Sequence, residues 1–116
     1  MSDSGPRSPS SSSASGAPLH STYAHDPEMR ELVEMFVQEM PERIEAIRAA
    51  FSSAELARLR TLSHQLKGAS AGYGFAPLGV AAGKVEDAVR STPDELASIR
   101  ERVDELVELC RRVTFG

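Results

Sequence analysis

The sequence lacks tryptophan, and aromatic residues make up only 5% of its 116 positions. Its single cysteine, Cys110, cannot form an internal disulfide, which favours a reducing compartment, and its place in a regular apolar repeat predicts a core residue. No apolar run approaches the roughly 20 residues of a membrane-spanning helix, and the first residues lack the apolar segment of a signal peptide. We therefore expect a cytoplasmic protein without a membrane segment.

An excess of positive charge is also missing. The chain has 13 Lys and Arg against 17 Asp and Glu, which gives a formal net charge of −4. A general nucleic-acid binder normally has a basic balance, so we expect no nucleic-acid partner. A hydrophobic content of 41% in 116 residues is enough for the core of one domain, which we expect to be monomeric.

The chain divides into two parts by composition. Residues 1–22 are rich in Ser, Pro and Gly, include the run Ser10-Ser11-Ser12-Ser13, and contain almost no large apolar side chains. Such a segment cannot offset the entropy lost on ordering. We predict a disordered tail or linker over residues 1–22 and a helical domain over residues 23–116.

Residues 23–116 have apolar side chains at intervals of three and four, which is typical of helices, and show no sustained alternation. Helix starts are indicated at Asp26-Pro27, Pro41, about residue 54, Pro77 and the capping box Thr92-Pro93-Asp94-Glu95. The turn Gly72-Tyr73-Gly74 ends the third helix. Because short connections make neighbouring helices antiparallel, we predict an all-α fold: an up-down-up-down four-helix bundle with a short additional N-terminal helix across one end.

His64 is the residue that a purely structural bundle does not explain. At about 100° per residue it lies about 160° around the third helix from Leu66, so Leu66 faces the core and His64 faces solvent. Lys67 lies about 60° to one side of His64 and Gly68 about 40° to the other. A neutral imidazole is a nucleophile that can form a phosphoramidate, and a lysine can pair with phosphate oxygens. We interpret His64 as a phosphoacceptor and Lys67 as the residue that stabilises its phosphate.

The helix face around His64 suits the approach of another protein. Glycine inside a helix costs about 1 kcal/mol relative to alanine, and we interpret Gly68 as allowing close approach by a partner protein. The predicted partner-docking residues are Arg60, Thr61, Gln65, Gly68 and Ala71. No glycine-rich phosphate loop is present, and the spacing of His20 and His25 does not fit a compact metal site, so we expect neither a cofactor nor a metal.

The string His64-Gln65-Leu66-Lys67-Gly68-Ala69-Ser70, followed by Gly74-Phe75, resembles the signature of histidine-containing phosphotransfer (Hpt) domains of two-component phosphorelays. The resemblance covers roughly residues 26–113, and the connection Phe51-Ser52-Ser53 departs from the short Gly-Asp turn of many relatives. It implies a phosphoryl carrier without ATP binding, whose partners are receiver domains or hybrid histidine kinases. Magnesium would belong to the partner's acidic site.

Two alternatives remain open at this stage. The chain could be a helical adaptor that docks on a receiver or kinase without being phosphorylated. It could also be the phosphoacceptor domain of a chemotaxis-type histidine kinase, which uses the same chemistry with a different phosphoryl donor.

Overall fold

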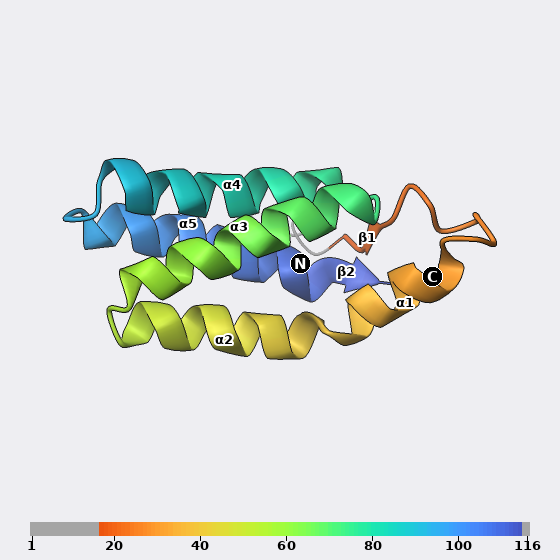
Figure 1. Ribbon diagram of the computed structural model, residues 1–116, viewed down its shortest axis with the longest axis horizontal. Coiled ribbons are helices and arrows are strands. Elements are labelled where there is room, and N and C mark those ends of the chain that lie inside the picture. The colour runs from red at the N-terminus through yellow and green to blue at the C-terminus, as the bar shows by residue number, and fades with distance from the viewer. Residues whose placement is uncertain (1–16, 115–116) are drawn as a thin grey trace, which may run out of the picture.

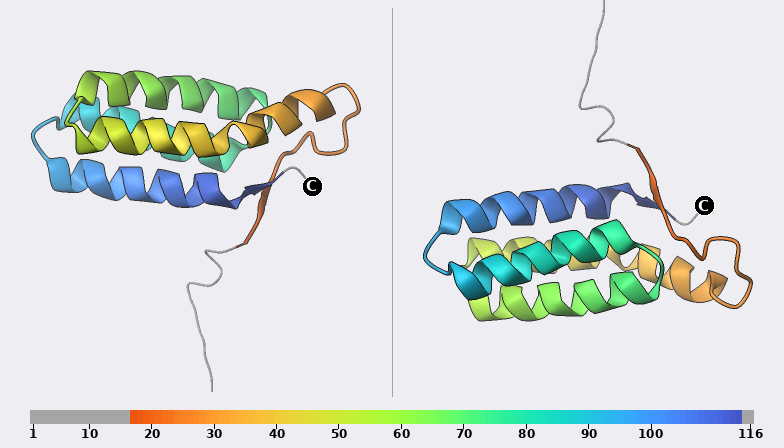
Figure 2. Two further views of the ribbon diagram at one scale, coloured as in Figure 1. Left: turned by 90° about the horizontal axis from the view of Figure 1, so that it is seen from below. Right: turned by 90° about the horizontal axis from the view of Figure 1, so that it is seen from above.

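Helices form nearly all the regular structure of residues 17–114, the part of the chain that the computed structural model describes. In chain order the elements are β1 (Leu19–His20), α1 (Arg30–Gln38), α2 (Met40–Ser52), α3 (Leu56–Gly72), α4 (Ala76–Ser91), α5 (Leu96–Arg112) and β2 (Val113–Thr114). Helices α2 to α5 lie side by side along one axis, and successive turns alternate between its two ends (Figures 1 and 2). The predicted antiparallel four-helix bundle with a short additional helix is confirmed.

The core forms where the apolar faces of the helices meet. Its largest fully buried side chains include Phe36, Ile47, Leu59, Leu66, Phe75, Leu78, Ile99 and Leu106. Burying a side chain of this size stabilises a fold by about 1.5–3 kcal/mol. Cys110 is also buried, as predicted, and loss of hydration raises the pKa of its thiol to about 12. Within residues 17–114 no helix combines the length and apolar character needed to cross a membrane.

Helix α1 lies at the end of the bundle that holds the turn between α3 and α4 (Figure 1). Pro41 lies in the first turn of α2, where its missing N–H costs no hydrogen bond. The helical chain changes direction just before it, between α1 and α2 (Figure 1). Phe36 of α1 is buried, and its ring centroid lies 5.5 Å from that of Phe75 and 5.2 Å from that of Tyr73. This aromatic cluster fixes α1 to the bundle end.

The starts of α1 and α3 differ from the predicted ones. Regular helix begins at Arg30 rather than at Pro27, because Asp26 organises a preceding turn in which its side chain accepts a hydrogen bond from the backbone N–H of Glu28 at 2.9 Å. Helix α3 begins at Leu56, two residues later than predicted, because Ala54 adopts a positive φ of 56° in the connection.

The capping box predicted at residues 92–95 is not formed. The hydroxyl of Thr92 donates a hydrogen bond back to the carbonyl of Ala88 at 2.9 Å, and α5 begins at Leu96 without a side-chain cap. The N–H of Glu95 instead donates to the backbone carbonyl of Thr92 at 3.0 Å. A threonine can bond to the carbonyl four residues before it as well as to an N–H ahead, and here the bond to the end of α4 is the one that forms.

The segment from Leu19 to Thr22 is attached to the bundle, in contrast to the disordered tail predicted over residues 1–22. Leu19 and His20 pair in parallel with Val113 and Thr114, which also adds a two-stranded sheet to the predicted all-α fold. The hydroxyl of buried Ser21 donates to the carbonyl of Tyr73 at 2.6 Å. The predicted boundary at residue 22 therefore falls inside an ordered segment, and residues 1–16 of the predicted tail lie outside the described residues.

Gly74 makes the contact between this segment and the α3–α4 turn possible. Its φ is +86°, a conformation that favours glycine, and its carbonyl accepts a hydrogen bond from the N–H of Thr22 at 2.9 Å. A Cβ at this position would lie 2.6 Å from the Ser21 hydroxyl and 2.9 Å from the Thr22 nitrogen. Any side chain would therefore strain the turn and displace the N-terminal segment.

We predict that Gly74→Ala lowers the free energy of unfolding by about 2 kcal/mol, from the positive φ and the contact with residues 21 and 22 together. Gly72→Ala is the matched control, because a Cβ at Gly72 would meet no atom within 4 Å. Urea unfolding measures both variants. Equal stabilities for the two would contradict the role given to Gly74.

Candidate functional site

Helices α3 and α4 approach each other closely because α4 has a glycine, Gly79, on the side that faces the backbone of α3. A Cβ placed on Gly79 would lie 3.3 Å from the backbone carbonyl of Lys67, and one placed on Gly83 would lie 3.5 Å from Cδ of Lys67. The absence of a side chain at Gly79 lets the two helices lie against each other at the level of Lys67, whereas Gly83 faces only the Lys67 side chain. Side chains from both helices can therefore meet next to His64, one turn away on α3.

His64 projects from the middle of α3 into solvent, as the helical spacing predicts. Its side chain is 70% exposed, whereas Leu66 is fully buried in the core. The surrounding α3 turns are regular, so the imidazole is mounted on a rigid element. A partner can reach it without any rearrangement of the bundle.

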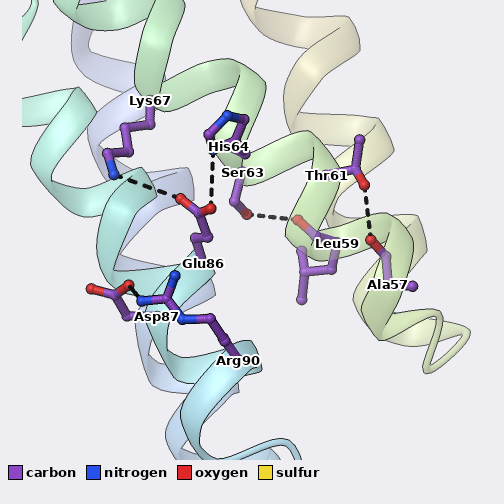
Figure 3. A network of polar contacts seen from close by, with 9 residues as sticks. All are labelled: Ala57, Leu59, Thr61, Ser63, His64, Lys67, Glu86, Asp87 and Arg90. Carbon is purple, nitrogen blue, oxygen red and sulfur yellow. Dashed lines mark hydrogen bonds and ion pairs between the residues drawn. The ribbon is translucent and has the colours of Figure 1, made fainter.

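A buried carboxylate, Glu86 of α4, lies beneath His64 and contacts it. The Oε2 atom of Glu86 is 3.0 Å from Nδ1 of His64, and only 9% of the Glu86 side chain is exposed (Figure 3). Because an ionised carboxylate can only accept, Nδ1 carries the proton in this hydrogen bond. In a neutral ring the other nitrogen, Nε2, then keeps its lone pair free.

The second carboxylate oxygen of Glu86, Oε1, has an ion-pair partner but no hydrogen bond within residues 17–114. Nζ of Lys67 lies 3.7 Å from Oε1, an ion-pair distance that is too long for a hydrogen bond. Oε1 has no hydrogen-bond partner among the described residues, and the Lys67 side chain is 54% exposed. The ammonium group is therefore held beside His64 by charge attraction and remains free to turn toward an anion on the ring.

Glu86 is the site residue that the sequence reasoning missed. It lies four residues after Ala82 and three before Val89, both of which are buried, so it falls on the apolar side of α4. A carboxylate on a buried helix face is uncommon unless it is paired. The position of Glu86 on the apolar face of α4 could have indicated a functional carboxylate, although the sequence pattern does not show which residue it pairs with.

The five predicted docking residues all lie on the surface of α3. Arg60, Thr61, Gln65, Gly68 and Ala71 are exposed. An open hollow beside the imidazole is lined by Ala57, Arg60, Thr61, His64, Gln65 and Glu86. A Cβ on Gly68 would meet no atom within 4 Å, so no contact among the described residues requires this glycine.

Comparison with known protein families supports the resemblance seen in the motif. The Hpt domain model matches residues 31–112, which include all five helices except the first residue of α1. No curated protein and no solved structure gives a match. An Hpt domain is a phosphotransfer module of a phosphorelay, typically a phosphoryl carrier rather than a kinase, and it interacts with receiver domains. Since the match covers most of the chain, the protein belongs to the Hpt domain family.

Proposed function

We propose that this protein accepts a phosphoryl group on Nε2 of His64 and exchanges it with an aspartate of a receiver domain. The observation that carries the proposal is the 3.0 Å contact between Nδ1 of the exposed His64 and the buried carboxylate of Glu86. A surface histidine without a function has no need of such a partner. A nucleophilic histidine needs one, because the ring must present a free nitrogen in a fixed direction.

The transfer step follows from this geometry. The lone pair of Nε2 attacks the phosphorus of the partner's aspartyl phosphate, a P–N bond forms, and the P–O bond to aspartate breaks. The aspartate carboxylate leaves with the electron pair of that bond. Nδ1 keeps its proton, so the phosphorylated ring is positively charged. Glu86 stabilises this charge, because a carboxylate at 3.0 Å in a poorly hydrated position interacts strongly with it.

Lys67 is suited to stabilise the phosphoryl group itself. Its ammonium group lies one helical turn from His64 and is bound to Glu86 only through the 3.7 Å ion pair. A dianionic phosphoryl group on Nε2 offers three strong acceptor oxygens to this cation. Lys67 would turn outward to the phosphate while Glu86 keeps its contact with Nδ1.

The exposed surface around His64 is where the receiver would dock. Gly68 and Ala71 have little or no side chain, so a partner can come close to the helix backbone beside the imidazole. Arg60, Thr61 and Gln65 offer polar contacts around this surface. Arg60 and Lys67 give this face a positive charge that complements the acidic pocket of a receiver. Magnesium, where the reaction needs it, would be bound in that pocket and not by this chain.

We predict that His64→Gln abolishes phosphorylation. The protein would be incubated with a panel of receiver domains charged with radiolabelled acetyl phosphate. The label on the unaltered chain should be acid-labile and alkali-stable, as a phosphoramidate is. His25→Gln, which changes another exposed histidine, is the matched control and should be labelled normally.

Two results of this experiment would count against the proposal. One is labelling of His64→Gln, and the other is failure of every receiver to label the unaltered chain. The second result would favour a non-phosphorylated adaptor. A second incubation with kinase domains and labelled ATP separates the two alternatives: labelling there, after failure of every receiver, would point to the phosphoacceptor domain of a chemotaxis-type kinase.

Glu86 should contribute to the rate of transfer through its charge. A hydrogen bond to a charged group contributes about 1 kcal/mol more than a neutral one, so Glu86→Gln should slow transfer roughly five- to tenfold while the protein stays folded. Glu86→Ala also removes the hydrogen bond and should be slower still. Single-turnover transfer from a labelled receiver measures both variants.

Asp87→Asn is the control for Glu86, since it removes the neighbouring carboxylate, which is 63% exposed and pairs with Arg90. Its transfer rate should equal that of the unaltered protein. A normal rate for Glu86→Ala would contradict the role given to Glu86.

A further inference from the structure

Gly83 is a buried glycine in the interior of α4, where glycine is less favourable than alanine. No backbone requirement explains it, because Gly74 is the only described glycine with a positive φ. The atoms that lie opposite Gly83 then decide how large a side chain this position can hold.

Among the described residues, the atoms of α3 that lie opposite Gly83 belong to the side chain of Lys67. A Cβ at Gly83 would lie 3.5 Å from Cδ and 3.7 Å from Cε of Lys67, and no other atom of residues 17–114 outside α4 would lie within 4 Å. From there the lysine continues along α4 to Glu86, three residues further on, where its Nζ is 3.7 Å from Oε1. The aliphatic part of Lys67 thus lies against α4 at Gly83. Figure 3 shows the Lys67 side chain extending from α3 toward the carboxylate of Glu86 on α4.

Gly79, one turn earlier on α4, has a different environment. A Cβ there would lie 3.3 Å from the backbone carbonyl of Lys67 and 3.6 Å from Cβ of Ser70, so Gly79 serves the packing of the two helices. At Gly83 the neighbour is instead a flexible side chain that is half exposed and can move away. The bundle does not depend on Gly83, but the path of Lys67 does.

We propose that Gly83 is a positioning residue for phosphotransfer. Because Gly83 has no side chain, Lys67 can lie against α4 at this position, and this path keeps the ammonium group of Lys67 beside His64. The proposal rests on the function proposed above for His64. Alanine fits, because a contact of 3.5 Å is ordinary van der Waals distance. A side chain with atoms beyond Cβ would occupy the place of Lys67 Cδ and Cε and turn the lysine into solvent. A displaced lysine must then be ordered anew each time it binds a phosphoryl group, at a cost in side-chain entropy.

The test compares Gly83→Leu with Gly83→Ala. Lys67→Ala should slow transfer from a labelled receiver by about tenfold, because it removes a charge-assisted contact to the phosphoryl group. The leucine variant should slow transfer severalfold, because the displaced lysine makes the same contact at a cost in side-chain entropy. The alanine variant should transfer at the normal rate and melt at the same or a higher temperature. If the alanine variant were as slow as the leucine variant, or the leucine variant were normal, the proposal would be wrong. Gly83→Met provides the same comparison if the leucine variant does not fold.

A double variant separates displacement of Lys67 from a direct clash with the receiver. In the Lys67→Ala background, Gly83→Leu should cause no further loss, because the residue through which it acts is already absent. A further severalfold loss in that background would show that the leucine obstructs the partner itself, and would overturn the proposal.

An NMR measurement on the unphosphorylated protein tests the contact without any activity. Nuclear Overhauser effects should connect the Cδ and Cε protons of Lys67 with the Cα protons of Gly83, and in Gly83→Leu the Lys67 side-chain shifts should move to those of a solvated lysine. Unchanged Lys67 shifts would refute the positioning role while leaving His64 as phosphoacceptor. Absence of label on His64 would instead refute the proposed function while leaving the contact in place.

Discussion

The contact between the carboxylate of Glu86 and Nδ1 of His64 is the interaction on which the site depends. A buried carboxylate without partners is strongly unfavourable, so Glu86 needs the hydrogen bond from His64 and the nearby charge of Lys67. Both partners come from the neighbouring helix, and they reach Glu86 only because α3 and α4 lie close together. Gly79 of α4 permits that approach, because a Cβ there would lie 3.3 Å from the backbone carbonyl of Lys67. In this way one polar interaction links helix packing to the orientation of the nucleophile.

The position of His64 opposite Glu86 also depends on the end of the bundle. Only three residues, Tyr73 to Phe75, connect α3 to α4, so the conformation of this turn sets the register of one helix against the other. Gly74 provides the positive φ in the turn, and Ser21 holds it from outside through its hydrogen bond to Tyr73. The N-terminal segment is thus tied to the same turn that aligns the two functional helices.

Regular periodicity made the bundle and the exposed face of His64 predictable, because both follow from positions on a single helix. Glu86 could not be assigned as the partner of His64, since the two residues are 22 positions apart in sequence and meet only through the register between two helices. The pairing of Leu19 with Val113 was also inaccessible, because two-residue strands leave no periodic pattern. Thr92 shows a third difficulty: the same hydroxyl can bond forward or backward, and local sequence does not choose.

The most direct test of this account is a long-range proton–nitrogen NMR spectrum of the His64 imidazole, recorded before and after phosphorylation by a charged receiver. The neutral ring should carry its proton on Nδ1, and the phosphorylated ring should show phosphorus coupled to Nε2 with the Nδ1 proton retained. A neutral ring protonated on Nε2, or phosphorus bonded to Nδ1, would contradict the role of Glu86 in presenting the nucleophile.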